Sequence, residues 1–324
     1  MRVLFNTYPW AFATPGGGEM QLLKYAEHLP AHGVEVVWHD IWKPQFDTVD
    51  AVHFFSCIGG SANFCGYVKE RGLPLIVSSS LWVTEATADR YPIEQIRTQL
   101  SFADAIVPNS TIEADKLAEV LDLPRERFKP VMNAADARFA RPADPALFRA
   151  RFEIDGPFVL CVGNIEPRKN QLSLVRALSA SNLPLVLAGE VRERQYADQV
   201  LAEGGSRLRY VGRIGHDDPL LASAYAACSV FALPSTLETP GLAALEAAAT
   251  GAAIVITHEG STREYFGDMA HYVDPSDPGD IGRKVELAMA TGPNPALKAH
   301  VTSRFTWPAA AAALASIYAD AKEC

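Results

Sequence analysis

Short apolar runs rich in β-branched and aromatic residues alternate with amphipathic helical patterns along nearly the whole chain. This alternation constrains the fold more than any other feature, because it is typical of a parallel sheet whose crossover connections are helices. A first predicted helix covers residues 18–33. The predicted strands are residues 2–6, 34–39, 51–55, 74–79, 105–108 and 129–133, followed by 158–163, 183–189, 208–212, 230–234, 252–257 and 270–274.

Residues 134–155 interrupt the alternation, because they are rich in alanine, proline and charge and contain no strand pattern. We predict a linker and a lead-in helix there, and therefore two doubly wound α/β domains at residues 1–145 and 146–305. A chain of 324 residues with 48% hydrophobic residues can form two such cores. The remaining segment, 306–324, is predicted to be a helix. Ligands of open α/β sheets bind at the carboxyl ends of the strands, so we expect a cleft where the two domains face each other.

The composition narrows the class of protein. The net charge of −9 argues against a nucleic-acid binder, which usually carries a basic face. No apolar stretch reaches the ~20 residues of a membrane span, and no signal peptide pattern is present. The five cysteines form no C-x-x-C pair, and no metal-ligand spacing or D-x-D triplet occurs. We therefore predict a cytoplasmic protein without a metal site, which could still attach peripherally to the inner face of a membrane.

A glycine cluster in "TPGGGEMQLL" follows the first predicted strand. Gly16, Gly17 and Gly18 can adopt φ > 0 and let the backbone approach a ligand closely. The helix that follows offers free N–H groups to an anion. The spacing is not G-x-G-x-x-G, so an ordinary strand-to-helix turn is an equal alternative.

Two adjacent cations in "CVGNIEPRKNQLSL" follow the strand that ends at Gly163. Arg168 and Lys169 stand just before a predicted helix. A flat guanidinium fork beside a compact ammonium suits a diphosphate. The alternative is a solvated pair on the surface.

The segment "LETPGLAALEAAATG" contains two glutamates in an otherwise mostly apolar stretch, and their function is the main question that the sequence raises. Glu238 and Glu246 are eight residues apart, or ~2.2 helical turns if the helix extends back to Glu238. A charge at Glu246 in this apolar run is costly unless it is paired. A carboxylate can accept two hydroxyl groups at once, as the acidic residue on the ribose does in dinucleotide folds. The alternative is a helix edge where Glu246 reaches water.

The N-terminal half offers two candidates for the acceptor side of a reaction. His53 lies in the predicted strand 51–55, and Ser80 follows the predicted strand 74–79. A lone histidine among apolar residues is more often part of the packing. The serine can equally begin a loop.

These stretches together resemble the retaining glycosyltransferases of family 4, which have the GT-B fold of two Rossmann-like domains facing across a cleft. The most specific match is "PSTLETPGLAALEAAATG" at residues 234–251, which is similar to the family pattern P-S-x-x-E-G-F-G-L-x-x-L-E-A-x-A-x-G. Supporting matches are "PGGGEMQLLKYAEHL", "VGNIEPRKN", "YVGRI", "NAAD" and "GSTREYFGD".

The resemblance implies a role for each matching position. Glu246 would hold the ribose of a nucleotide sugar, and Glu238 would face hydroxyl groups of the donor sugar. Arg168 and Lys169 would clamp the diphosphate, so these two and Glu238 are the implied catalytic residues. Further positions implied in nucleotide-sugar binding are Gly16, Gly17, Gly163, Asn164, Thr239, Pro240, Gly241 and Leu242.

The sequence departs from the family pattern at several positions. Asn164 stands where the family often has an arginine, and Thr239-Pro240 replaces a Gly-Phe pair. Ala134 replaces the glycine of an N-G-x-D turn. Ser80 stands where many members carry a histidine near the transferred sugar.

The resemblance implies a retaining, metal-independent transfer from a UDP- or GDP-sugar to a hydroxyl acceptor, without a cofactor. The acceptor would be a saccharide, a lipid-linked sugar or a small molecule, in polysaccharide or glycoconjugate biosynthesis. The last helix would return to the N-terminal domain. Three alternatives remain open: a GT-B nucleotide-sugar epimerase, a non-catalytic partner subunit and, from the glycine cluster alone, a nicotinamide oxidoreductase.

Overall fold

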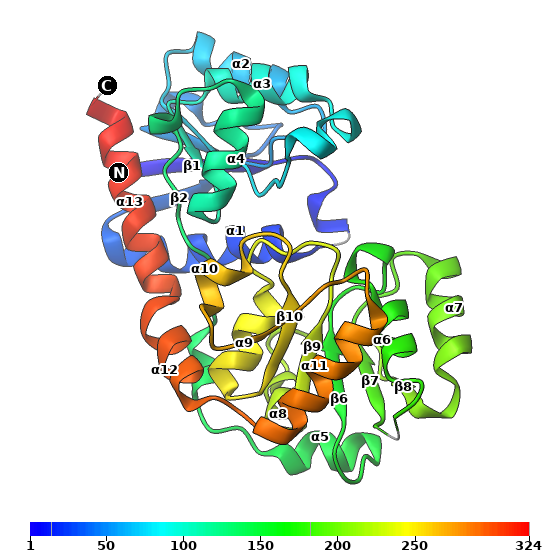
Figure 1. Cartoon of the computed structure of the whole chain (residues 1–324). Coiled ribbons are helices and arrows are strands. Elements are labelled where there is room, and N and C mark those ends of the chain that lie inside the picture. The colour runs from blue at the N-terminus through cyan, green and yellow to red at the C-terminus, as the bar shows by residue number, and fades with distance from the viewer. Residues whose placement is uncertain (14, 182, 324) are drawn as a thin grey trace. The chain divides into compact units, whose positions relative to one another are not determined.

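The computed structural model describes residues 1–13, 15–181 and 183–323, with the side chain of residue 323 left out. The chain divides into two compact units, each a parallel sheet with helices (Figure 1). Unit 1 comprises Met1–Asn133 with Trp307–Cys324, and unit 2 comprises Ala134–Thr306. Two Rossmann-like domains were predicted, and this fold class is confirmed.

The sheet of unit 1 has the strand order β2-β1-β3-β4-β5, and neighbouring strands run parallel. Its strands are β1 (Arg2–Thr7), β2 (Glu35–Trp38), β3 (Ala51–Phe55), β4 (Leu75–Ser78) and β5 (Ala105–Val107). The sixth strand predicted in this half, 129–133, is wrong. Lys129 and Val131 donate backbone hydrogen bonds to the carbonyl oxygens of Ile106 and Pro108, but Pro108 has no N–H to donate to the Lys129 carbonyl, so the pairing stays an isolated bridge between Ile106 and Phe128.

Helices cover both faces of this sheet, because side chains alternate along each strand. Leu4, Val52 and Phe54 share a buried cluster with residues of α2 (Ala62–Glu70), α3 (Ile93–Phe102) and α4 (Thr111–Leu121). On the opposite face, β4 contacts α13 (Trp307–Glu323), which also contacts α1 (Gly17–His28). The short 3-10 helices of unit 1 are η1 (Ala11–Ala13), η2 (Leu29–His32), η3 (Phe46–Thr48), η4 (Glu85–Arg90) and η5 (Arg125–Arg127).

The first predicted helix, 18–33, is two elements in the structure. α1 ends at His28, and the 3-10 helix η2 continues to His32 with Pro30 near its start. Gly33 ends this segment as expected, since its φ of 74° lies in the left-handed region that favours glycine.

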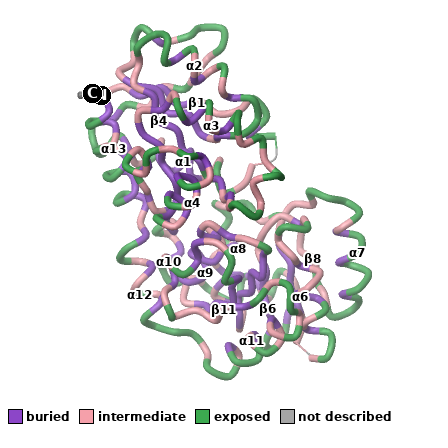
Figure 2. Tube along the Cα trace, turned by 45° about the horizontal axis from the view of Figure 1, so that its top comes forward, coloured by how far each residue is buried: buried purple, intermediate pink, exposed green. Residues whose placement is uncertain are grey.

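The sheet of unit 2 has the strand order β11-β10-β9-β6-β7-β8 and is also parallel. All six strands predicted in this half are present: β6 (Val159–Val162), β7 (Leu185–Ala188), β8 (Leu208–Tyr210), β9 (Val230–Leu233), β10 (Ile254–Thr257) and β11 (His271–Val273). Its helical elements are η6 (Ala137–Ala140), α5 (Pro145–Phe152), η7 (Pro167–Lys169), α6 (Gln171–Ala177), α7 (Arg194–Gly204), η8 (Gly205–Arg207), α8 (Pro219–Ala227), α9 (Leu242–Thr250), α10 (Thr262–Phe266), α11 (Pro278–Thr291) and α12 (Pro295–Arg304). In both units the strands are mostly buried and the exposed residues lie mainly on helices and loops (Figure 2).

The division between the units falls at residue 133, and not at residue 145 as the composition suggested. The segment between these positions packs into unit 2. The ring of Phe139 in η6 lies 5.6 Å from that of Tyr225 in α8, and Ser223 of α8 accepts the backbone N–H of Phe148 in α5. In unit 1, the rings of Trp307 and Tyr25 are 5.8 Å apart, so the start of α13 packs on α1.

Each sheet has a point at which the strand order reverses. In unit 1 it lies between β1 and β3, and in unit 2 between β6 and β9. Loops after the two strands at such a point diverge to opposite faces of the sheet and leave a crevice, which is where doubly wound folds bind ligands. The loops after these four strands are therefore where functional side chains are expected.

Candidate functional site

At the reversal point of unit 2, a buried ion pair joins the loop after β6 to the loop after β9. Lys169 Nζ lies 2.5 Å from Glu238 Oε1, and the two side chains are only 13% and 6% exposed. Ser235 Oγ donates to the same carboxylate oxygen at 2.6 Å. The aliphatic stem of Lys169 passes over Gly163, where an added Cβ would lie 3.5 Å from it. The predicted residues Gly163, Lys169 and Glu238 are thus brought together.

Glu238 is held as a carboxylate. Burial alone would raise its pKa, but the charges of Lys169 and Arg168 outweigh this effect, and the net pKa lies below its ordinary value. Arg168 Nη1 is 3.8 Å from Glu238 Oε1, and the guanidinium is half exposed. The loop therefore presents one buried and one accessible cation beside a fixed negative charge.

A third cation, Arg192, reaches this group from the loop after β7. Glu166 bridges two arginines, with Oε1 3.1 Å from Arg168 Nη2 and Oε2 3.4 Å from Arg192 Nη1. With its amide oxygen turned toward Arg192, Asn164 accepts from Nε at 2.9 Å and from Nη2 at 3.2 Å. Arg192 was missed in the sequence, although it follows a strand at the same edge of the sheet.

The helix of the glutamate motif does not extend back to Glu238, so the condition for a spacing of two helical turns between the glutamates is not met. α9 begins at Leu242, after Gly241, whose φ is 78°. A Cβ at Gly241 would also lie 3.3 Å from Leu233 Cδ2, so this turn admits only glycine without adjustment. Glu238 instead bridges Gly260, where a Cβ would come within 2.0 Å of the Glu238 carbonyl oxygen.

The predicted backbone positions between the two glutamates share this turn. Thr239 and Leu242 are half-buried, whereas Pro240 and Gly241 are buried. The Thr239 carbonyl accepts a hydrogen bond from Ser261 Oγ at 3.2 Å. This fixes the path of the chain from β9 into α9.

Glu246 lies in the second turn of α9 and is paired through both carboxylate oxygens. His216 Nε2 is 2.9 Å from Oε1, and Tyr225 donates its hydroxyl to Oε2 at 2.9 Å. The alternative of a glutamate turned to water is wrong, since this residue is only 8% exposed. Burial and the neighbouring Glu246 charge raise the pKa of Tyr225 well above its ordinary value, which keeps it a donor. His216 was not among the site residues predicted from the sequence.

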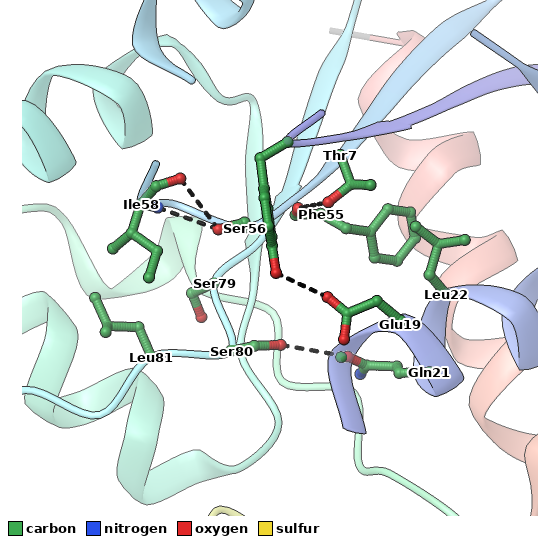
Figure 3. A pocket seen from close by; sticks show the side chains of 12 residues that line it. Thr7, Glu19, Gln21, Leu22, Phe55, Ser56, Ile58, Ser79, Ser80 and Leu81 are labelled. Atoms are coloured by element: carbon green, nitrogen blue, oxygen red, sulfur yellow. Dashed lines mark hydrogen bonds between the residues drawn. The ribbon is translucent and has the colours of Figure 1, made fainter. Parts of the chain in front are cut away.

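At the reversal point of unit 1, a cavity of about 200 Å³ opens between the start of α1 and the loops after β1, β3 and β4 (Figure 3). Glu19 and Gln21 of α1 lie on one side of it, and Ser56, Ile58 and Leu81 lie on the other. Ser80 lines this cavity, where its hydroxyl donates to Gln21 Oε1 at 3.3 Å. We call this cavity the unit 1 pocket.

Two serines that line the unit 1 pocket have left-handed backbones, with φ of 118° at Ser56 and 42° at Ser80. The other non-glycine residues with positive φ that the structure describes are Asp122, Glu153 and Asn170, and each stands at a helix end. Such conformations cost about 1–3 kcal/mol and cluster at functional sites. The backbone strain in unit 1 is therefore concentrated beside the pocket.

His53 is a wrong candidate for contact with an acceptor. It is fully buried, and its ring stacks on Phe55 with the centroids 4.0 Å apart. Its Nδ1 is 2.6 Å from the Tyr318 hydroxyl, and its Nε2 is 2.9 Å from Ser78 Oγ. His53 therefore joins β3 to α13 and to β4.

The glycine cluster lies beside the unit 1 pocket, but not in the conformation that the sequence suggested. Gly16 is the N-cap of α1 with φ of −131°, and none of Gly16, Gly17 and Gly18 has a positive φ. Glu19 accepts the Gly16 N–H at 2.7 Å. A Cβ at Gly18 would meet no atom within 4 Å, so the glycine leaves space at the pocket wall.

In the part of the chain that the structure describes, no group of three or more histidine, cysteine, aspartate or glutamate side chains is arranged to hold a metal ion. Within the same residues, no helix has the length and apolar character needed to cross a membrane.

Comparison with known proteins identifies the family. The family model described as "Glycosyl transferases group 1" matches residues 146–299, which is most of unit 2. The chain is 31% identical over 224 residues to the serotype-specific mannosyltransferase WbdA of Escherichia coli, covering 63% of this chain and 27% of that protein. It is 30% identical over 309 residues to a D-inositol 3-phosphate glycosyltransferase of Thermobispora bispora, covering 85% of this chain and 71% of that protein. The chain thus spans about a quarter of WbdA.

Solved structures agree on the fold. The sucrose-phosphate synthase of Thermosynechococcus elongatus matches with a TM-score of 0.79 and 20% identity over 98% of both chains. Anabaena HepE, solved in complex with UDP, matches with a TM-score of 0.72 and 17% identity over 100% of this chain and 98% of that one. The sequence relatives and the shared fold lead to one conclusion: this chain belongs to the glycosyl transferases group 1 family.

Proposed function

We propose that this chain transfers a sugar from a nucleotide-diphosphate sugar to a hydroxyl acceptor, with retention of configuration and without a metal ion. The observation that carries the proposal is the charged Glu238 buried beside Lys169 and Arg168 at the reversal point of unit 2. A sugar hydroxyl can donate to the carboxylate while the cations face the diphosphate. One loop pair thus offers both kinds of group that a nucleotide sugar requires.

The proposed chemistry places charge where these residues lie. The C1–O bond to the diphosphate breaks as positive charge builds on the sugar ring, and negative charge grows on the leaving phosphate oxygen. Arg168 and Lys169 would stabilise that oxygen, and fixed charges of this kind act without reorganising at the moment of reaction. We include Arg192 in the clamp, because it contacts Asn164, the position at which an arginine is missing.

The anomeric configuration would be retained if the acceptor oxygen attacks C1 from the same face of the sugar from which the diphosphate departs. The acceptor oxygen forms a bond to C1 as the C1–O bond to diphosphate breaks, and the acceptor proton passes to the leaving phosphate oxygen. No side chain needs to form a covalent intermediate. The metal-independent part of the proposal is tested by turnover in EDTA, which should be unchanged.

The ribose of the donor would bind at Glu246. A carboxylate has about four acceptor positions, and Tyr225 and His216 use two of them. The ribose hydroxyls would donate to the others. The UDP in the HepE structure and the names of the sequence relatives support a nucleotide-sugar donor and a role in polysaccharide or glycoconjugate assembly.

A thermal-shift screen of UDP, GDP and their sugars would identify the donor. Calorimetry then tests the ribose contact with the matched pair UDP and 2′-deoxy-UDP, or GDP and 2′-deoxy-GDP. Wild type should bind the ribonucleotide about tenfold more tightly, since a hydrogen bond to a charged group is worth about 1.5–3 kcal/mol. Glu246→Gln should lose most of this preference. An unchanged preference in that variant would refute the ribose role.

Product analysis tests the reaction itself. NMR of the product should show the anomeric configuration of the donor, and inversion would refute the retaining mechanism. Conversion of the donor to an isomer without any acceptor would instead identify an epimerase.

A further inference from the structure

The outer edge of the unit 1 sheet is formed by β2, which stands at the end of the strand order. Glu35 and His39 donate their N–H groups to carbonyl oxygens of the neighbouring segment 1–5, at 2.8 and 3.0 Å. Because the backbone groups of successive strand residues point to opposite sides, the N–H and C=O groups of Val36 and Trp38 face away from β1. The edge thus offers two donors and two acceptors to a further strand.

The two residues whose backbone faces outward carry apolar side chains. Proteins usually protect an open sheet edge with a lysine, a proline or a bulge. Here Val36 is half-buried and Trp38 is 48% exposed. Both side chains lie on the same face of the sheet, since side chains alternate along a strand. They line a groove of about 520 Å³ together with Ala26 of α1 and Pro30 of η2, which leaves room for an apolar side chain beside Val36.

Exposed apolar surface continues beyond the strand. Ile41 is 71% exposed and Trp42 is 85% exposed. The N–H of Trp42 donates to Asp40 Oδ1 at 2.8 Å, which fixes the turn that carries both side chains. Large exposed apolar side chains that gather in one place indicate an interaction surface. Together with Trp38, these residues extend the apolar surface from β2 into the following loop.

Charge does not oppose the approach of a second copy at this edge, although the chain has a net charge of −9. Arg2 Nε lies 3.1 Å from Glu35 Oε2, so these two charges of the groove are paired with each other. Among the described residues that line the groove, the other side chains are apolar or glycine. Recognition at this edge therefore has to come from the backbone and from apolar contact.

We propose that unit 1 binds a second copy of this chain by antiparallel pairing of the two β2 edges about a two-fold axis. Val37 would stand opposite Val37 of the second copy, and Val36 would exchange backbone hydrogen bonds with Trp38 of the second copy. The same pair brings an aromatic side chain against a β-branched one, which stabilises paired strands. The two five-stranded sheets would then form one continuous sheet.

Other antiparallel registers use backbone groups that are already bonded. An axis at Val36 would place Trp38 opposite Val34, whose N–H donates to a carbonyl of η2 at 3.3 Å. An axis at Trp38 would place Val36 opposite Asp40, whose N–H donates to a glutamine side chain at 3.4 Å. The register centred on Val37 avoids both conflicts. The strand therefore specifies one way of pairing with itself, and this self-complementarity favours a second copy as the partner.

Analytical ultracentrifugation of the full chain over a concentration series measures the association. We expect reversible conversion of the 35.1 kDa chain to a species of twice that mass. Trp38→Lys should raise the dissociation constant at least about 30-fold, because it removes a central aromatic contact and brings two like charges together. Trp10→Lys is the matched control and should dimerise like wild type, since Trp10 is 60% exposed and also packs edge-on against one aromatic ring. Thermal midpoints check that both variants are folded.

A disulfide tests the register. Opposed residues at a non-hydrogen-bonded position have Cα atoms about 4.5 Å apart, which a disulfide can span. Val37→Cys should therefore form an oxidised dimer. Val36→Cys should not, because the two copies of this position would lie roughly 8 Å apart. The wild-type chain with its five cysteines gives the background.

Three results would overturn the proposal: a monomer over the whole concentration series, unchanged dimerisation of Trp38→Lys, or equal cross-linking of Val36→Cys and Val37→Cys. Co-sedimentation of a monomeric chain with vesicles of phosphatidylethanolamine and phosphatidylglycerol that depends on Trp42 would assign the apolar surface to a membrane, and would also overturn it. The proposal is independent of the proposed transfer, because these measurements report on the association of unit 1 alone.

Discussion

In each unit a buried titratable side chain lies in or after a central strand, Glu238 in unit 2 and His53 in unit 1, and the two are held in different charge states. Glu238 in unit 2 has a lowered pKa and stays charged, because Lys169 and Arg168 surround it. His53 in unit 1 has a pKa lowered to about 3 by burial and stays neutral, with two hydroxyl groups as its partners. Unit 2 thus holds a charged carboxylate beside cations at its reversal point, whereas His53 of unit 1 is held neutral by its burial.

The loops at the two reversal points present different groups. Fixed cations beside a carboxylate suit a ligand with an anionic and a polyol part, whereas the unit 1 pocket is lined by hydroxyl groups, an amide and one carboxylate. The same sheet architecture can therefore present two sets of groups, because the loops alone determine which side chains face a ligand.

The largest effect is expected from breaking the charged pair of unit 2. Lys169→Met should lower turnover with the donor found by the screen about 100- to 1000-fold, as for the loss of one donor to a developing anion. It should also destabilise the chain by about 3–5 kcal/mol, because Glu238 is left buried without its closest cation.

A second variant separates these two effects. Lys169→Met combined with Glu238→Gln removes the unpaired charge, so the free energy of unfolding in urea should recover most of the loss while turnover stays low. Recovery of turnover together with stability would mean that Lys169 acts only as a partner of Glu238, and the clamp would be refuted.

Most strands were predicted from the sequence, because burial on both faces gives each strand of a parallel sheet a short apolar run. The strand order, and with it the two reversal points, comes from the structure. The run 129–133 was predicted as a strand from its composition, but Pro108 beside it lacks the N–H that would complete the ladder, and composition does not report hydrogen bonds between segments. The charged loop residues were also found, since Arg168, Lys169 and Glu238 directly follow predicted strands.

Partners contributed by distant segments could not be predicted. Arg192 and His216 belong to other loops, and only the folded sheet brings them to Asn164 and Glu246. His53 shows the reverse, because its strand is central and α13 from the end of the chain covers it, so a residue suited to catalysis is fully buried.

An effect of intermediate size is expected in the pH dependence of stability, which tests whether His53 is neutral in the folded chain. Its pKa is lower in the folded chain than the ordinary 6.5 of the unfolded chain, so the unfolded chain binds more protons between these values and stability falls with acidification. From pH 7 to pH 5 this one group should remove about 2 kcal/mol from the free energy of unfolding. Glu238 contributes only at lower pH, since its stabilisation is lost below the ordinary 4.5 of the unfolded carboxyl.

His53→Asn removes the titration and keeps hydrogen-bonding groups near Tyr318 and Ser78. Urea unfolding at pH 7 and pH 5 should therefore show a pH dependence that is smaller in the variant than in wild type by that amount. Equal pH dependence in the two proteins would mean that His53 titrates normally in the folded chain.

The smallest effects on stability are expected at two residues with left-handed backbones, Asn170 in unit 2 and Ser80 in unit 1. Asn170, with φ of 57°, donates its amide to the carbonyl oxygens of Pro234 and Pro275 at 2.9 and 2.8 Å, and asparagine tolerates this conformation. Asn170→Gly should lower the free energy of unfolding by about 1–2 kcal/mol, because two partly buried hydrogen bonds are lost and little strain is relieved.

Ser80→Gly should change the free energy of unfolding by less than about 0.5 kcal/mol. The relief of strain at φ of 42° is offset by the greater freedom of glycine in the unfolded chain, and the hydroxyl makes only long contacts of 3.3 Å with Gln21 and Asn109. Thermal and urea unfolding of the two glycine variants measure the contrast. If Ser80→Gly were the more destabilising of the two, the serine hydroxyl would be a structural anchor like the Asn170 amide, and the strain beside the unit 1 pocket would need no ligand to account for it.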